Sequence, residues 1–176
     1  MMTSFVVTIL GPDRPGLVEA LSQTIADHQG NWMESRMAQL AGRFAGLLRV
    51  SVPAAQAEAL AVALQENTAA DLTVIIESSD ATTTVASGYW LNLELIGQDR
   101  PGIVRDITHV LAELKVNVEE FSSECIDASM SGETLFQAEA RLRVPESLPS
   151  GRLREALEGL ADQLMVDIKL DETTET

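Results

Sequence analysis

An octet of glycine, proline, aspartate and arginine residues occurs twice in the chain, as GPDRPGLV at residues 11–18 and as GQDRPGIV at residues 97–104. Such residues suit three kinds of chemistry: a glycine-rich loop can hold phosphate, aspartates can exchange protons, and backbone N–H groups at the start of a helix can bind a carboxylate. Neither octet has the Gly-Lys-Ser/Thr ending of a phosphate loop, and neither fits the dinucleotide fingerprint. The octet is therefore neither a phosphate loop of the nucleotide-binding kind nor a dinucleotide-binding loop.

The two octets are part of a longer repeat within the 176-residue chain. A shift of 86 residues places Gly11 on Gly97. The same shift places Asn31 on Asn117. Later the offset grows to 92, so we expect six extra residues of the second copy within residues 126–134, in a loop between strands.

The repeat also predicts the domain boundaries. Residues 78–88 are rich in serine and threonine and poor in large apolar side chains, which is typical of a linker. We predict one domain at residues 1–79, a linker at residues 80–88, a second domain at residues 89–171 and a flexible tail at residues 172–176.

The apolar period alternates between strand and helix in each copy. Leu91, Leu93 and Leu95 alternate with polar residues, which predicts a strand with one buried face, and Phe5, Val7 and Ile9 are their counterparts. After each octet the spacing becomes helical, with proline and aspartate at the helix start. We further predict strands at residues 31–40, 43–52, 72–77, 117–127, 133–144 and 165–170, and helices at residues 54–66 and 150–163.

This order of elements predicts an α+β fold with two ferredoxin-like βαββαβ domains, each an antiparallel sheet with both helices on one face. The other face and the sheet edges of such a domain need a neighbour or solvent-compatible residues. We therefore expect the domains to pair and the protein to form a homodimer.

The DRPG turn after the first strand, the apolar helix and the asparagine that opens the second strand resemble the ACT domain, a regulatory amino-acid-binding module. The resemblance covers both copies and nearly the whole chain. Two such domains without a catalytic domain are most similar to the glycine cleavage system transcriptional repressor family. The resemblance implies a ligand that lies between paired domains near the turn, and a regulator that acts on a DNA-bound activator protein.

The residues of the turn suit a zwitterionic ligand. Backbone N–H groups at the helix start can hold a carboxylate, and an asparagine side chain can bind both an ammonium and a carboxylate. The predicted ligand-binding residues are Gly11, Asp13, Arg14, Pro15, Gly16, Leu17, Asn31, Gly97, Asp99, Arg100, Pro101, Gly102, Ile103 and Asn117.

Structural interpretations of the same residues stay open. The glycines allow a sharp exit from the strand, Asp13 and Asp99 suit helix caps, and the arginines suit solvated or ion-paired positions. The copies differ at Pro12 and Gln98, and at Trp32 and Val118, so one of the two pockets can be altered or inactive.

Enzymatic chemistry finds no support in the sequence. No nucleophile, histidine and carboxylate set has a suitable spacing, and His28 and His109 are not equivalent in the repeat. In a regular strand Glu119 and Glu120 would point to opposite sides, and Cys125 is expected to be a buried or idle thiol. We therefore predict no catalytic residue, metal or cofactor.

One enzyme class stays open as a remote alternative. An acylphosphatase-like hydrolase also uses an arginine in the first loop and an asparagine on the next strand. The longer glycine-bearing phosphate cradle of that family is missing here.

Composition limits the partners. The chain has 27 acidic and 12 basic residues, and its net charge of -15 repels nucleic acid and anionic lipid. The N-terminal residues lack the basic start and long apolar core of a secretory signal, and no apolar run reaches membrane-spanning length. We expect a cytoplasmic regulator that binds a small amino acid, with glycine as the candidate ligand, and acts on a transcriptional activator. The alternative is an amino-acid sensor that regulates an enzyme or another protein.

Overall fold

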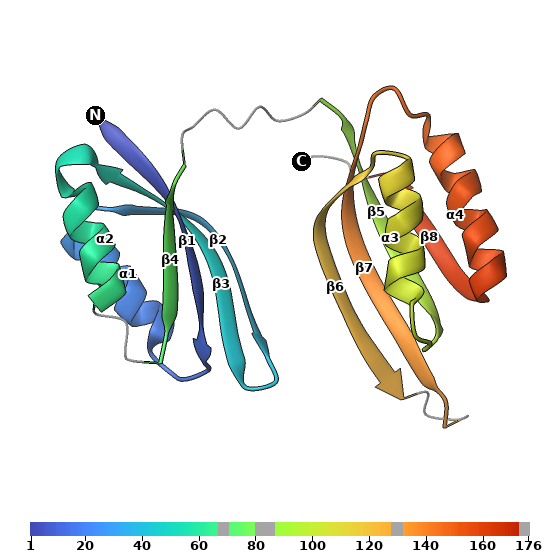
Figure 1. Cartoon of the computed structure of the whole chain (residues 1–176), viewed down its shortest axis with the longest axis horizontal. Coiled ribbons are helices and arrows are strands. Elements are labelled where there is room, and N and C mark those ends of the chain that lie inside the picture. The colour runs from blue at the N-terminus through green and yellow to red at the C-terminus, as the bar shows by residue number, and fades with distance from the viewer. Residues whose placement is uncertain (67–70, 80–86, 128–131, 173–176) are drawn as a thin grey trace. The chain divides into compact units, whose positions relative to one another are not determined.

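The computed structural model describes residues 1–66, 71–79, 87–127 and 132–172 of the chain. The chain divides into two compact units, Met1–Thr84 and Val85–Thr176 (Figure 1). Both units have the order strand, helix, strand, strand, helix, strand, which confirms the predicted pair of ferredoxin-like domains. Most of the predicted linker lies outside the described residues.

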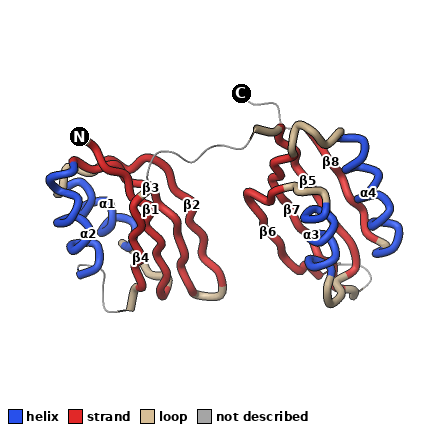
Figure 2. Tube along the Cα trace, turned by 45° about the horizontal axis from the view of Figure 1, so that its top comes forward, coloured by secondary structure: helices blue, strands red, loops and turns tan. Residues whose placement is uncertain are grey.

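The first unit is a four-stranded antiparallel sheet in the order β2-β3-β1-β4. Its two helices lie on one face of this sheet (Figure 2). The elements are β1 (Met2–Pro12), α1 (Leu17–Asp27), β2 (Asn31–Leu40), β3 (Arg43–Pro53), α2 (Ala57–Glu66, after the short 3-10 turn Ala54–Gln56) and β4 (Thr73–Ser78).

The second unit repeats this sheet in the order β6-β7-β5-β8. Its elements are β5 (Tyr89–Gln98), α3 (Ile103–Glu113), β6 (Asn117–Asp127), β7 (Thr134–Val144), α4 (Ser150–Leu164) and β8 (Val166–Glu172). Glu172, which we expected to open the tail, pairs with Leu91 as the last residue of β8. Residues 173–176 lie outside the described part of the chain.

The two units differ most where the middle strands are joined. In the first unit a two-residue turn joins β2 to β3, and both of its residues have positive φ, 49° at Ala41 and 77° at Gly42. Such turns match the twist of a hairpin. In the second unit the extra residues predicted from the repeat lie between β6 and β7, where residues 128–131 are outside the described ranges.

Each unit has its own apolar core between the sheet and its helices. Leu91, Leu93 and Leu95 are buried, as the alternating pattern predicted. Val18 and Val104 share the helical spacing of the core residues, yet both are exposed. The reason is geometric: in α1 the buried residues recur every fourth position, so the face that meets the sheet is narrow.

Candidate ligand-binding site

Each octet forms a corner between the first strand and the first helix of its unit. Gly16 precedes α1 with φ 87°, and Gly102 precedes α3 with φ 90°. These angles are in the left-handed region, where a Cβ is costly, so glycine suits both positions. The carbonyl of Gly16 accepts a hydrogen bond from the N–H of Ala20, and Gly102 does the same for Asp106. The backbone of the corner is therefore alike in both units.

The first glycine of each octet has another role than the sharp exit that we expected. Gly11 and Gly97 pair within β1 and β5, and their φ values are not in the left-handed region. A Cβ on Gly97 would lie 2.8 Å from the Cβ and 3.0 Å from the Cα of Val166. A Cβ on Gly11 would collide with Leu72. These glycines allow the last part of each unit to approach the first strand closely.

The aspartates of the octets do not cap the helices. Neither α1 nor α3 has a side-chain cap hydrogen bond, so the capping interpretation of Asp13 and Asp99 is wrong. The backbone N–H of Asp13 donates to the carbonyl of Gly42, and that of Asp99 donates to the carbonyl of Thr134, both at 3.0 Å. Both aspartates are exposed. Their backbone bonds tie the corner to the neighbouring hairpin.

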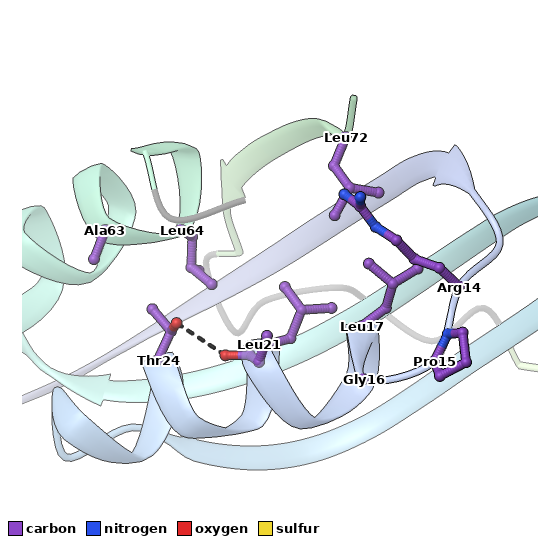
Figure 3. A pocket seen from close by; sticks show the side chains of 10 residues that line it. Arg14, Pro15, Gly16, Leu17, Leu21, Thr24, Ala63, Leu64 and Leu72 are labelled. Carbon is purple, nitrogen blue, oxygen red and sulfur yellow. Dashed lines mark hydrogen bonds between the residues drawn. The ribbon is translucent and has the colours of Figure 1, made fainter. Parts of the chain in front are cut away.

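A cavity of about 180 Å³ adjoins the corner of the first unit, between α1 and α2 (Figure 3). Its walls are residues 14–17 of the corner, Ala20, Leu21 and Thr24 of α1, Ala63 and Leu64 of α2, and Leu72. Figure 3 shows the side chain of Arg14 extending from the corner toward Leu72. The Thr24 hydroxyl donates to the carbonyl of Ala20 at 2.9 Å, so its hydrogen is already used. The cavity is thus mainly apolar, with a cation at one end.

The cation at this end, Arg14, is incompletely paired. Its Nη1 lies 3.9 Å from Oδ2 of Asp71, and the two side chains are 39% and 63% exposed. An exposed ion pair at that distance contributes little to the stability of the folded protein. Its Nη2 is buried and has no hydrogen-bond partner among the residues that the structure describes. Because a buried N–H without an acceptor is unfavourable, this end of the cavity suits an anion.

The equivalent arginine of the second unit is paired with a carboxylate of the protein itself. Asp106 places Oδ2 3.4 Å from Nη2 of Arg100. Its Oδ1 lies 2.7 Å from Nη2 of Arg105. The 86-residue shift aligns Asp106 with Ala20, so the first unit has no carboxylate at this helix position. Asp106 therefore balances the positive charge of Arg100 at the second corner, and the first corner has no such carboxylate at the equivalent helix position.

The predicted asparagines lie far from the corners of their own units. Asn31 is in register with Ser51, which pairs with Ser4 of β1, whereas Gly11 is at the other end of β1. Seven residue positions of a strand span roughly 23 Å. Asn117 and Gly97 are separated in the same way. A small ligand therefore cannot touch both the asparagine and the corner of the same unit.

This separation also argues against the acylphosphatase-like alternative. That arrangement needs the loop arginine and the asparagine around one phosphate, but Arg14 and Asn31 are at opposite ends of the sheet. The asparagine side chains have local partners instead. Nδ2 of Asn31 lies 3.2 Å from Sδ of Met33, and Nδ2 of Asn117 donates to Oε1 of Glu119 at 2.6 Å.

The remaining predicted residues divide between packing and cavity wall. Leu17 and Ile103 are buried at the start of their helices. Pro15 lines the cavity, while Pro101 is exposed at the second corner.

Sequence reasoning missed the walls of the cavity beyond the corner, because they come from two helices and a loop. The missed residues, all of which line the cavity, are Ala20, Leu21, Thr24, Ala63, Leu64 and Leu72. One signal was available: the repeat aligns alanine with aspartate two residues after the octet. A change from an acid to a small residue beside an arginine indicates a difference in the site.

The expectation that Glu119 and Glu120 point to opposite sides is wrong. A shift of register between Val118 and Glu120 breaks the regular alternation of β6. Glu119 then lies 2.6 Å from Nη2 of Arg143, and Glu120 lies 3.7 Å from Nη1 of Arg141. Both arginines contact the ring of Trp90 on the sheet face away from the helices. The two carboxylates are bound in ion pairs on one face.

The cysteine and the two histidines lie outside the candidate site. Cys125 is exposed, so of the two expected alternatives the buried thiol is wrong, and the idle thiol stays a prediction. His28 lies 2.8 Å from the carbonyl of Thr24, and His109 lies 3.6 Å from Glu113. In the described ranges, no three acidic, histidine or cysteine residues are grouped to hold a metal. Nor is any described helix long and apolar enough to cross a bilayer.

A family comparison agrees with the repeat. The ACT domain model matches the chain twice, over residues 3–79 and 91–171. The chain is also 37% identical over 75 residues to a UPF0237 protein of Methanopyrus kandleri. That match covers 42% of this chain and 77% of the relative.

Two solved structures share the whole two-domain layout. An unknown protein from Galdieria sulphuraria is 30% identical with a TM-score of 0.88, and the match covers 99% of this chain and 100% of that one. A candidate glycine cleavage system transcriptional repressor is 18% identical with a TM-score of 0.71, and the match covers 99% of both chains. The latter likeness is one of fold.

Proposed function

The chain belongs to the ACT domain family, and on this premise we propose that it is a non-catalytic cytoplasmic regulator that binds a small amino acid and controls transcription through an activator protein. The observation that carries the proposal is the tandem ACT layout, which extends over nearly the whole chain. The same layout occurs in a candidate glycine cleavage system transcriptional repressor, which supports a role in the control of transcription. Glycine as the ligand and an activator as the partner belong to the proposal.

The corners are the proposed place of amino-acid binding. Arg14 offers a buried, unpartnered N–H, which supports binding of the ligand carboxylate in the first unit. Nε of Arg100 is also buried without a partner among the described residues, but its Nη2 already has the Asp106 carboxylate, which favours the first unit over the second. Asn31 contributes only where a second domain or a second copy brings it to a corner.

The proposed contact with the activator uses the open face of the first sheet. Leu10, Leu47 and Ile75 are 44%, 51% and 51% exposed. Leu47 and Ile75 are in register with Thr8 on the two sides of β1, so their side chains lie on the same sheet face with Thr8 between them. An exposed apolar patch of this kind is typical of protein contacts, and the net charge of -15 disfavours DNA as the partner. We also propose a homodimer through exposed sheet edges.

Calorimetric titration with glycine, serine and leucine tests the ligand. We expect heat from at least one of these, lost in Arg14→Ala and kept in Arg100→Ala. Asn31→Ala and Asn117→Ala show whether an asparagine takes part. Absence of heat with every amino acid would contradict amino-acid sensing.

A gel-shift assay tests the route to transcription. We expect the chain to leave naked promoter DNA unshifted and to change the mobility of the same DNA when the glycine cleavage activator is bound. Leu47→Asp, on the open sheet face, should abolish that change, and Val62→Asp, which is exposed on α2, is the matched control. A shift of naked DNA would contradict the proposal. Amino-acid binding without any effect on the activator would favour the alternative, a sensor that regulates an enzyme or another protein.

A further inference from the structure

We infer that the cavity between α1 and α2 of the first unit binds a small aliphatic carboxylate, with Arg14 on the carboxylate and the aliphatic tail between the two helices. The inference rests on the proposed function in that it names the ligand class of the proposed sensor. It differs in one respect, because glycine has no tail and would leave the cavity walls in contact with water.

The second unit shows how a carboxylate fits against this arginine. There Asp106 reaches Arg100 from the first turns of the helix, at 3.4 Å between Oδ2 and Nη2. In the first unit the same helix position is Ala20, which is itself part of the cavity wall. Nη2 of Arg14 correspondingly has no partner among the described residues. A ligand carboxylate beside Ala20 would supply the acceptor that Asp106 supplies in the second unit.

The rest of the cavity suits an apolar group. Leu17, Leu21 and Leu64 are 8%, 2% and 1% exposed, so their side chains are held in the core rather than free to fill the space. Leu72 closes the side toward Arg14 (Figure 3). An apolar cavity of about 150 Å³ admits a molecule as large as benzene. The cavity of about 180 Å³ therefore accepts a branched tail of roughly four or five carbons.

The mouth of the cavity admits two kinds of aliphatic carboxylate. Asp71 lies 3.9 Å from Nη1 of Arg14 and is 63% exposed, so its carboxylate is available to a ligand ammonium in water. An aliphatic amino acid and a carboxylate without an amino group share the carboxylate and the tail. Comparison of leucine with 4-methylpentanoate separates them.

Calorimetry of the full chain with five probes tests the inference: leucine, 4-methylpentanoate, glycine, acetate and 3-methylbutylamine. Each methylene removed from water strengthens binding about fourfold, so a four-carbon tail predicts about 250-fold tighter binding than the tailless probe of the same class. We expect leucine or 4-methylpentanoate to bind, and the ratio between them identifies the source. Equal affinity for glycine and leucine, together with equal affinity for acetate and 4-methylpentanoate, would overturn the inference. Equally tight binding of the amine would also overturn it.

Ala20→Asp provides the matched variant. We expect the new carboxylate to pair with Arg14, as Asp106 pairs with Arg100, and to weaken binding of the tailed carboxylate at least tenfold. Ala59→Asp makes the same change at an exposed position of α2 outside the cavity wall, and we expect it to bind as the unaltered chain does. Circular dichroism shows that both variants fold. Unchanged binding in Ala20→Asp, or an equal loss in Ala59→Asp, would refute the assignment.

The outcomes separate this inference from the proposed function. If neither tailed probe binds more tightly than its tailless counterpart, and glycine alters the contact with the activator, the inference fails and the proposed function stands. If tailed carboxylates bind in the cavity and the activator is unaffected, the inference stands and the transcriptional role fails.

Discussion

Replacement of Gly97 by alanine tests the close approach of β5 and β8. The added Cβ would lie 2.8 Å from the Cβ and 3.0 Å from the Cα of Val166. These atoms belong to the backbone or to its first side-chain carbon, so rotation of a flexible side-chain end cannot relieve the overlap. The two strands must move apart, which disturbs the pairing of Gly97 with Val166.

Overpacking of this kind costs typically about 1–3 kcal/mol. Because the collision involves the strand itself, we expect the upper part of that range, about 2–3 kcal/mol. In urea a slope of about 1 kcal/mol per molar converts this into a midpoint lower by about 2–3 M. Fluorescence in a Trp32→Phe background measures it, since Trp90 then reports on the second unit alone.

Two further glycine variants control the experiment. Gly159→Ala lies inside α4, where a Cβ meets nothing within 4 Å, and should raise stability by about 0.5–1 kcal/mol. Gly11→Ala meets a terminal methyl of Leu72, which can rotate away, and the carbonyl oxygen of Asp71 at 3.0 Å. Among the residues that the structure describes, it meets no Cβ or Cα at less than 3.0 Å, so its cost in the first unit should be smaller than that of Gly97→Ala. An unchanged or raised midpoint for Gly97→Ala would refute the close-approach argument.

The surroundings of Tyr89 and Cys125 can each be tested by a direct measurement on the side chain. Burial, followed by the charge of Glu172, raises the pKa of Tyr89 above 10.0, and its hydroxyl donates to the carbonyl of Leu148 at 2.8 Å. Absorbance titration of this one tyrosine should therefore give a midpoint above 10.0, and a midpoint at or below that value would contradict the expected burial effect. Since the folded-state pKa is the higher one, the stability that Tyr89 contributes is complete below about pH 10 and is lost as the pH rises through the folded-state value. Cys125 is exposed on the edge strand β6, so a thiol reagent should modify it in the folded protein, and a reaction that required urea would refute its exposure.

Much of the fold follows from local patterns in the sequence. The alternation of Leu91, Leu93 and Leu95 predicts a half-buried strand, because successive side chains of a strand point to opposite faces. The repeated octet predicts the start of a helix, and Gly16 and Gly102 have the left-handed angles that glycine tolerates. Such signals depend only on residues that are close together in the sequence. They can therefore be recognised without knowing which distant residues are in contact.

The candidate site was only partly predictable. Arg14 was identified from the octet, but the cavity beside it needs Leu64 and Leu72, which come from a later helix and loop. Asn31 was assigned to the same site, whereas α1 carries the chain back to the opposite end of the sheet before β2 begins.

The sequence by itself determined the two copies, the order of their strands and helices, and the glycines of the corners, because periodicity and turn chemistry are local. Only the tertiary structure decided which residues surround each arginine. Asp106 lies on the same helix position as Ala20, yet its effect depends on the direction of the arginine side chain and on the 3.4 Å between Asp106 and Arg100. Contacts of this kind are set by how helices pack against the sheet and against each other, and that packing sums many weak interactions between residues that are distant in the sequence.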